Sequence, residues 1–146
     1  MEAKDFIIGG WYYHKEKNLD GSPRICAEKV DLGIIKCILD YTNEYFEAKD
    51  YNPIPISEDI LEKNGFEIVY SSYISKSYCL YDDYEDGTEK FRIEVKLYQY
   101  TPNTCFIDIK HYGIGSVRLK FSFVHELQQA LRLCGLGEIA DNFIIK

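Results

Sequence analysis

The sequence predicts an α+β protein: a small N-terminal β unit, then an antiparallel sheet packed by two helices, the last of them C-terminal. Apolar residues recur at helical spacing over residues 124–134, at Val124, Leu127, Leu131 and Cys134. Segments of alternating apolar and polar residues precede this helix, at residues 91–99, 105–111 and 117–123. The apolar helix face needs a sheet to cover it, so we expect this helix to close the sheet.

The alternation assigns each side chain of these strands to one face. The face beneath the last helix is predicted to hold Phe91, Ile93, Val95, Leu97, Cys105, Ile107, Ile109, Val117, Leu119, Phe121 and Phe123. The solvent side of the helix is predicted to hold Glu126, Gln128, Gln129 and Arg132. Two more strands are expected upstream, over residues 67–73 and 78–82. For the second strand, the pattern does not decide which of its two faces points into the core.

A short helix over residues 57–64 is predicted before the strands. Pro53 and Pro55 favour extended backbone, and Ser57 can cap the free N–H groups of the helix that follows. Gly65 supplies the left-handed residue that ends it. Ile60 and Leu61 are its expected buried contacts.

The N-terminal third predicts a small, barrel-like β unit. Strands are expected at residues 6–14, 25–30, 33–39 and 45–48, with a turn at 18–23; a helix over 32–39 is the alternative for the third strand. We therefore divide the chain into a β subdomain, residues 1–52, and an α+β part, residues 53–146, which together form one compact unit.

Charge suggests a register for the last three strands. If Leu97 lies opposite Ile107, Lys96 lies opposite Asp108, and the next hairpin places Lys120 on the other side of Asp108. In this register, carboxylates neutralise part of a face whose cations and aromatic rings resemble a base-stacking surface. The residues of that face are Arg92, Lys96, Lys110, Arg118, Lys120, Tyr98, Phe106 and Tyr112.

Composition narrows the classes of partner. The net charge of −7 argues against nucleic acid and against a membrane surface as partners, because both are polyanions that attract clustered Lys and Arg. Five cysteines without a CxxC pair are typical of reduced thiols, which predicts a cytoplasmic protein. No segment approaches the apolar length of a membrane span. The thirteen tyrosines favour contact surfaces.

The candidate contact surface is an acidic, tyrosine-rich segment at a predicted hairpin: Tyr81, Asp82, Asp83, Tyr84, Glu85 and Asp86. Its spacing does not match a calcium loop, because Ile93 stands where the bidentate Glu is required. Cys105 and His111 are the strongest Cys-His pair for catalysis, but both are predicted on the buried face. His14 and His125 lie in no catalytic motif, so we predict no catalytic residue, no cofactor and no metal site.

Three segments resemble a known group of sequences. These are Ile8-Gly9-Gly10-Trp11, then Pro53-Ile-Pro-Ile-Ser-Glu-Asp-Ile-Leu-Glu-Lys-Asn-Gly-Phe66, then Val124-His-Glu-Leu-Gln-Gln-Ala-Leu-Arg-Leu-Cys-Gly135. Together they resemble small uncharacterised proteins of Bacteroidota genomes, prophages and mobile elements. Ser57 stands where that group commonly has Thr, and residues 137–146 extend past its usual helix end. The resemblance implies origin and fold, and it carries no activity or site residue.

These observations favour a non-enzymatic, cytoplasmic interaction protein, encoded by a phage or mobile element, that binds a host protein through the acidic surface. The alternative is a small-ligand or nucleotide-binding protein, or a small enzyme, that uses a groove between the two subdomains.

Overall fold

The computed structural model describes residues 10–30, 51–99, 105–111 and 115–145. The chain divides into two units, residues 1–54 with 145–146, and residues 55–144. Each is built on its own antiparallel sheet, which confirms the predicted α+β class.

The first unit contains a three-stranded sheet in the order β2-β1-β3. Its strands are β1 (Trp11–Lys17), β2 (Pro23–Lys29) and β3 (Tyr51–Pro53). The predicted turn between β1 and β2 closes with Asn18 N–H donating to the Ser22 carbonyl at 2.9 Å, and Gly21 takes a φ of 81°. The strands predicted at residues 33–39 and 45–48, and the alternative helix, lie outside the described residues, so the barrel-like closure stays a prediction.

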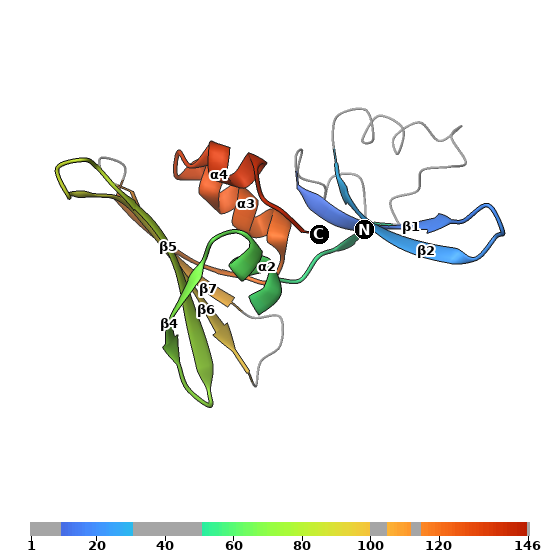
Figure 1. Cartoon of the computed structure of the whole chain (residues 1–146), viewed down its shortest axis with the longest axis horizontal. Coiled ribbons are helices and arrows are strands. Elements are labelled where there is room, and N and C mark those ends of the chain that lie inside the picture. The colour runs from blue at the N-terminus through green and yellow to red at the C-terminus, as the bar shows by residue number, and fades with distance from the viewer. Residues whose placement is uncertain (1–9, 31–50, 100–104, 112–114, 146) are drawn as a thin grey trace. The chain divides into compact units, whose positions relative to one another are not determined.

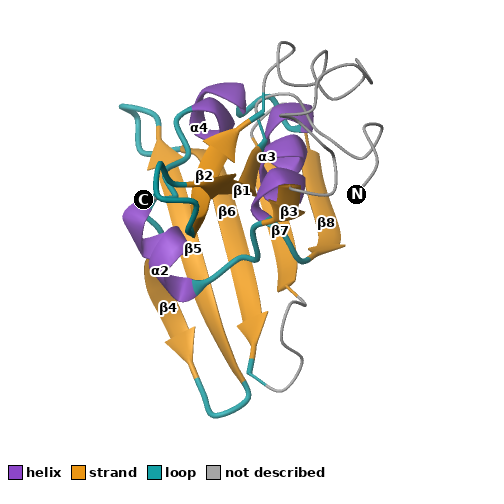
Figure 2. Ribbon diagram, turned by 90° about the vertical axis from the view of Figure 1, so that its right-hand side faces the viewer, coloured by secondary structure: helices purple, strands orange, loops and turns teal. Residues whose placement is uncertain are grey.

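The second unit contains a five-stranded meander, each strand paired with its neighbour in the chain (Figure 2). Its strands are β4 (Glu67–Ser71), β5 (Ser75–Asp83), β6 (Glu89–Tyr98), β7 (Cys105–His111) and β8 (Gly115–Phe121). Helices α2 (Glu58–Lys63), α3 (Val124–Leu133) and α4 (Gly137–Asp141) all lie on one face of this sheet (Figure 1). We call that face the inner face and the opposite one the outer face.

The predicted helix ends are confirmed. Ser57 Oγ accepts a hydrogen bond from the Ile60 N–H at 3.4 Å, and Gly65 has a φ of 80°. The Glu126 side chain reaches back to accept from the Phe123 N–H at 3.0 Å, so α3 starts without a capping hydroxyl. Leu136 N–H donates to the Leu131 carbonyl at 2.9 Å and ends that helix in a Schellman-type turn at Gly135.

The inner face is the core of the second unit. Ile93, Val95, Ile107 and Ile109 are fully buried there, as are Val124, Leu127 and Leu131 of the apolar face of α3. The sequence pattern did not decide which face of β5 points inward. Tyr78 and Leu80 are on the inner face, because they pair with Val95 and Ile93. At the β8 edge the burial weakens, and Val117 and Leu119 stay 37% and 40% exposed.

The register predicted from charge is wrong by two residues. Leu97 pairs with Cys105 and Val95 with Ile107, so Lys96 lies opposite Phe106 rather than Asp108. On the other side Asp108 pairs with Arg118 and not with Lys120. A two-residue slip leaves every side chain on its predicted face, and an exposed ion pair is worth at most about 1 kcal/mol, so charge alone does not select the register.

The prediction that Gln128 faces solvent is also wrong. Its side chain is completely buried, and its Nε2 donates to the Ala140 carbonyl at 2.7 Å. The covering element is α4, which follows α3 after Leu136 and packs against it. Arg132, on the same side, pairs with Asp141 at 2.7 Å.

Gln128→Ala is expected to lower the free energy of unfolding by about 2 kcal/mol, because the buried Ala140 carbonyl loses its donor and a cavity remains. Gln129→Ala, on the neighbouring half-buried position, is the matched control and should stay within about 0.5 kcal/mol of wild type. Urea unfolding of the two variants measures the difference. Equal midpoints would contradict the placement of α4 over Gln128.

Glu58 gives the second unit a stability term that depends on pH. Its Oε2 accepts from Lys76 Nζ at 2.6 Å and from the Tyr78 hydroxyl at 2.8 Å. These hydrogen bonds lower the pKa of the Glu58 carboxyl below its ordinary value of 4.5, and the bond from Lys76 has the larger effect. Such a group contributes stability above its unfolded pKa and loses it as the pH falls through the folded pKa.

In Glu58→Gln we therefore expect the free energy of unfolding to fall less steeply than in wild type as the pH drops below 4.5, with the curves parallel above it. Tyr78→Phe keeps the carboxylate, removes one donor and should show an intermediate slope. Urea unfolding at a series of pH values measures the slopes. Identical acid slopes for wild type and Glu58→Gln would show that these bonds do not persist in solution.

Candidate functional site

The candidate site lies on the outer face of the five-stranded sheet. Among the described residues of this unit, no helix lies over that face (Figure 1). Side chains directly opposite one another on neighbouring strands form rows across the sheet, about 5 Å apart within a row. Successive rows on the same face are about 7 Å apart, because two residues separate them along each strand.

Two rows carry the chemistry of the site. The aromatic row is Lys96, Phe106 and Lys120, so Phe106, which is 39% exposed, lies between two lysines of the neighbouring strands. The charged row is Glu94, Asp108 and Arg118. Glu94 and Asp108 are directly opposite each other, and like charges in that position are destabilising. Arg118 offsets one carboxylate through Nη2 and Nε, which lie 2.5 and 3.2 Å from Asp108 Oδ2.

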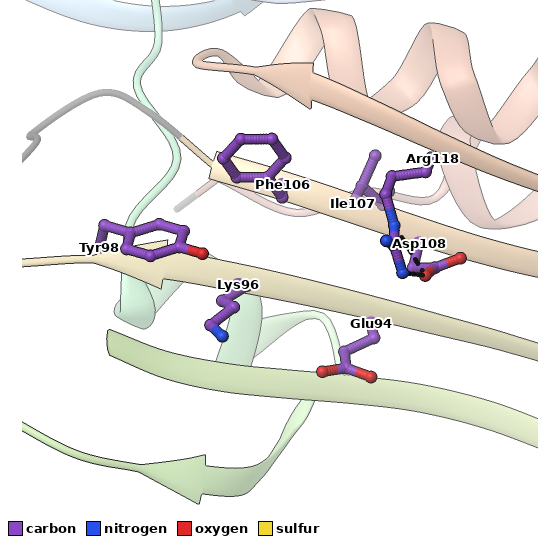
Figure 3. A pocket seen from close by; sticks show the side chains of 7 residues that line it. All are labelled: Glu94, Lys96, Tyr98, Phe106, Ile107, Asp108 and Arg118. Atoms are coloured by element: carbon purple, nitrogen blue, oxygen red, sulfur yellow. Dashed lines mark hydrogen bonds and ion pairs between the residues drawn. The ribbon is translucent and has the colours of Figure 1, made fainter. Parts of the chain in front are cut away.

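All residues of these two rows except Lys120 line an open groove of about 380 Å³. Figure 3 shows Tyr98 and Phe106 toward one end and the Arg118–Asp108 pair at the other, with Glu94 near that pair. The two rings meet edge to face, with centroids 5.8 Å apart and planes at 74°, and Lys96 Nζ lies 5.5 Å from the Tyr98 centroid. The residues that line the groove are Glu94, Lys96, Tyr98, Phe106, Ile107, Asp108 and Arg118.

The predicted contact segment lies at one end of the same sheet. Tyr81, Asp82 and Asp83 end β5, and Tyr84, Glu85 and Asp86 form the turn into β6; all six are exposed. The turn is closed by Tyr84 N–H to the Thr88 carbonyl and Gly87 N–H to the Tyr84 carbonyl, both at 2.8 Å. We call Tyr81 to Asp86 the acidic hairpin.

Two of its carboxylates have structural bonds. Asp86 Oδ1 accepts from the Thr88 backbone N–H at 2.9 Å and from the Thr88 hydroxyl at 2.6 Å, which lowers the pKa of Asp86. Asp82 pairs with Lys90 at 3.0 Å. Asp83 and Glu85 are therefore the carboxylates of the hairpin best placed to meet a partner.

The structure separates the predicted Cys-His pair. Cys105 and His111 are at opposite ends of β7, and six residues of strand span about 20 Å. Burial raises the pKa of the Cys105 thiol to about 11, which disfavours its nucleophilic form. His111 Nδ1 lies 2.7 Å from the Cys134 carbonyl, and the buried His125 ring stacks on Phe123. These contacts give both histidines structural partners, His125 as a buried residue and His111 as a half-buried one.

A polar cluster in the first unit was not predicted. His14 lies directly opposite Cys26, and its ring stacks on Tyr51 with centroids 4.4 Å apart. Its Nδ1 is 3.2 Å from Glu28 Oε2, an atom that also accepts from the Tyr51 hydroxyl at 3.1 Å. The cluster joins all three strands of this sheet. The period-two pattern of residues 12–16 was the available signal, since it places His14 on the side of the buried Tyr12.

No family model, curated protein or solved structure matches this chain. Within the described ranges, no His, Cys, Asp and Glu side chains gather as three or more potential metal ligands. The helices that the structure describes are all too short or too polar to cross a membrane.

The observed register predicts an energetic coupling between Arg118 and Asp108. A double-mutant cycle of Arg118→Ala and Asp108→Ala should give a coupling of about 0.2–1 kcal/mol, as for an exposed ion pair. The matched cycle of Lys96→Ala and Asp108→Ala should give a coupling near zero, because these residues are in different rows. Urea unfolding supplies the free energies. A larger coupling for Lys96 would favour the register expected from charge.

Proposed function

We propose that this chain is a non-enzymatic interaction protein, encoded by a phage or mobile element, that binds a host protein through the acidic hairpin. The proposal of origin rests on the resemblance of the 53–66 and 124–135 segments to proteins of mobile elements. The proposal of binding rests on one observation. The acidic hairpin presents exposed tyrosines and carboxylates on a turn that its own hydrogen bonds hold in shape.

The turn favours binding because its backbone is already ordered before a partner binds. Gly87 takes a φ of 79°, which the turn requires, and Asp86 fixes Thr88 on the other side of it. A contact surface that is already ordered loses less conformational entropy when it binds. Tyr81 and Tyr84, 54% and 44% exposed, offer large contact areas with few rotatable bonds.

Charge specifies the partner. Residues 82–92 hold five carboxylates and two cations, an excess of three negative charges, on a chain that is itself at −7. Asp83 and Glu85 extend this charge to solvent. Such a surface speeds the approach of a basic partner and repels an acidic one. We therefore assign the partner a lysine- and arginine-rich surface.

Glu85→Lys is expected to weaken partner binding at least about five-fold at low salt, because it reverses a charge at the tip of the hairpin without removing a structural bond. The partner is first captured from host lysate by cross-linking to the wild-type chain, then purified, and its Kd measured by calorimetry. Glu62→Lys, an exposed charge reversal on α2, is the matched control and should bind nearly as wild type.

The difference in Kd between Glu85→Lys and Glu62→Lys should become smaller as salt is raised. The Debye length is about 10 Å at 0.1 M salt and shortens further with added salt, which screens the charge contribution. Tyr81→Ala should weaken binding at every salt concentration, because its contact is apolar. Equal affinity of wild type, Glu85→Lys and Tyr81→Ala for the captured protein would rule out the hairpin as the binding surface.

A further inference from the structure

We propose that the groove on the outer face is a binding site for a free nucleotide, with its base on Phe106 and its phosphate beside Lys96. This site is separate from the acidic hairpin and does not depend on the function proposed for it.

The aromatic row supplies the first part of this site. Phe106 exposes part of its ring on the sheet face, where a planar base can stack on it. Its direct neighbours on both sides are Lys96 and Lys120, and Lys96 lines the groove, so an anion attached to a stacked base can meet its ammonium group. The register expected from charge would have placed both lysines beside Asp108 and left Phe106 without this arrangement.

The charged row supplies specificity. Among the residues that the structure describes, Glu94 accepts no hydrogen bond, while Asp108 is held by Arg118. Glu94 is the diagonal neighbour of Phe106, one row away on the adjacent strand, and such neighbours lie about 7–8 Å apart, within reach of aromatic and long side chains. A carboxylate accepts hydrogen bonds from the exocyclic amino group of cytosine. We therefore assign the site a base that carries an amino group, in preference to uracil.

Size and charge favour a single nucleotide over a strand. The groove of about 380 Å³ falls at the lower end of the range for small-molecule sites. The two cations and two carboxylates that line it leave it neutral, and the whole chain is at −7. A long polyanion meets the repulsion of the whole chain, whereas one phosphate beside Lys96 meets mainly the local field of that lysine.

The test is a titration of the ¹⁵N-labelled full chain with cytidine monophosphate, followed by NMR. We expect saturable shifts at the amides of residues 94–98, 105–108 and 118–120, with little change at the acidic hairpin. Phe106→Ala should lower the affinity about ten-fold. Tyr81→Ala, an exposed aromatic of the same face outside the groove, is the matched control and should bind as wild type.

Specificity is tested by comparing cytidine and uridine monophosphate on the same protein. Wild type should prefer the cytidine compound about five-fold, and Glu94→Ala should lose that preference while still binding both. Because both ligands are measured on each variant, a loss of folded protein does not alter the ratio. Lys96→Ala should weaken both ligands equally. Lys110→Ala, which lies on the same face two rows from the aromatic row, should leave both unchanged.

Three results would overturn the assignment. The first is an absence of saturation with either nucleotide at millimolar concentration. The second is wild-type affinity in Phe106→Ala. The third is a cytidine octanucleotide that binds more than about a hundred-fold tighter with a steep salt dependence, which would identify a nucleic-acid strand as the ligand.

Discussion

The architecture of the second unit depends on the burial of one face of a five-stranded sheet. Ile93, Ile107 and Ile109 are fully buried on the face that α3 covers. Each such side chain contributes about 1.5–3 kcal/mol when it leaves water. The same alternation that builds this apolar face puts mainly polar residues on the opposite face, with Phe106 as an apolar exception. Within the described residues of this unit, one layer of helices therefore secures the core, and no helix lies over the outer face.

The strand faces follow from the sequence, but the register does not. Alternation in residues 91–99 and Cys105–His111 sets which side chains are buried, and a slip of two residues preserves that division. Charge pairing was the remaining guide, and it misled because exposed ion pairs contribute so little. The observed register instead places residues of like charge opposite each other in two pairs, Glu94 with Asp108 and Arg92 with Lys110. Local sequence carries no signal for that choice, so the composition of the groove became visible only in three dimensions.

The C-terminal segment illustrates a second limit of sequence patterns. Helix α4 has five residues, too few to display a helical period, so the solvent side of α3 was assigned from α3 alone. That assignment fails at Gln128, which α4 covers. The Gln128 side chain donates to the Ala140 carbonyl, which would otherwise be buried without a partner. By contrast, the hairpin at Asp86-Gly87 was predicted correctly because Asp-Gly sets a turn through its own backbone preferences. Local chemistry is readable from sequence, whereas coverage by a distant element is not.

The distribution of charge separates the two proposed binding surfaces of one sheet. The acidic hairpin concentrates part of the net charge of −7 on an exposed turn, and its field acts over about a Debye length. On the other strands, Lys96 and Arg118 line a groove in which cations and carboxylates balance. The proposed long-range attraction of a basic protein and the proposed short-range selection of a small anion therefore do not compete. A chain with uniformly mixed charge could perform neither, because each surface needs a local excess or a local arrangement that averaging would remove.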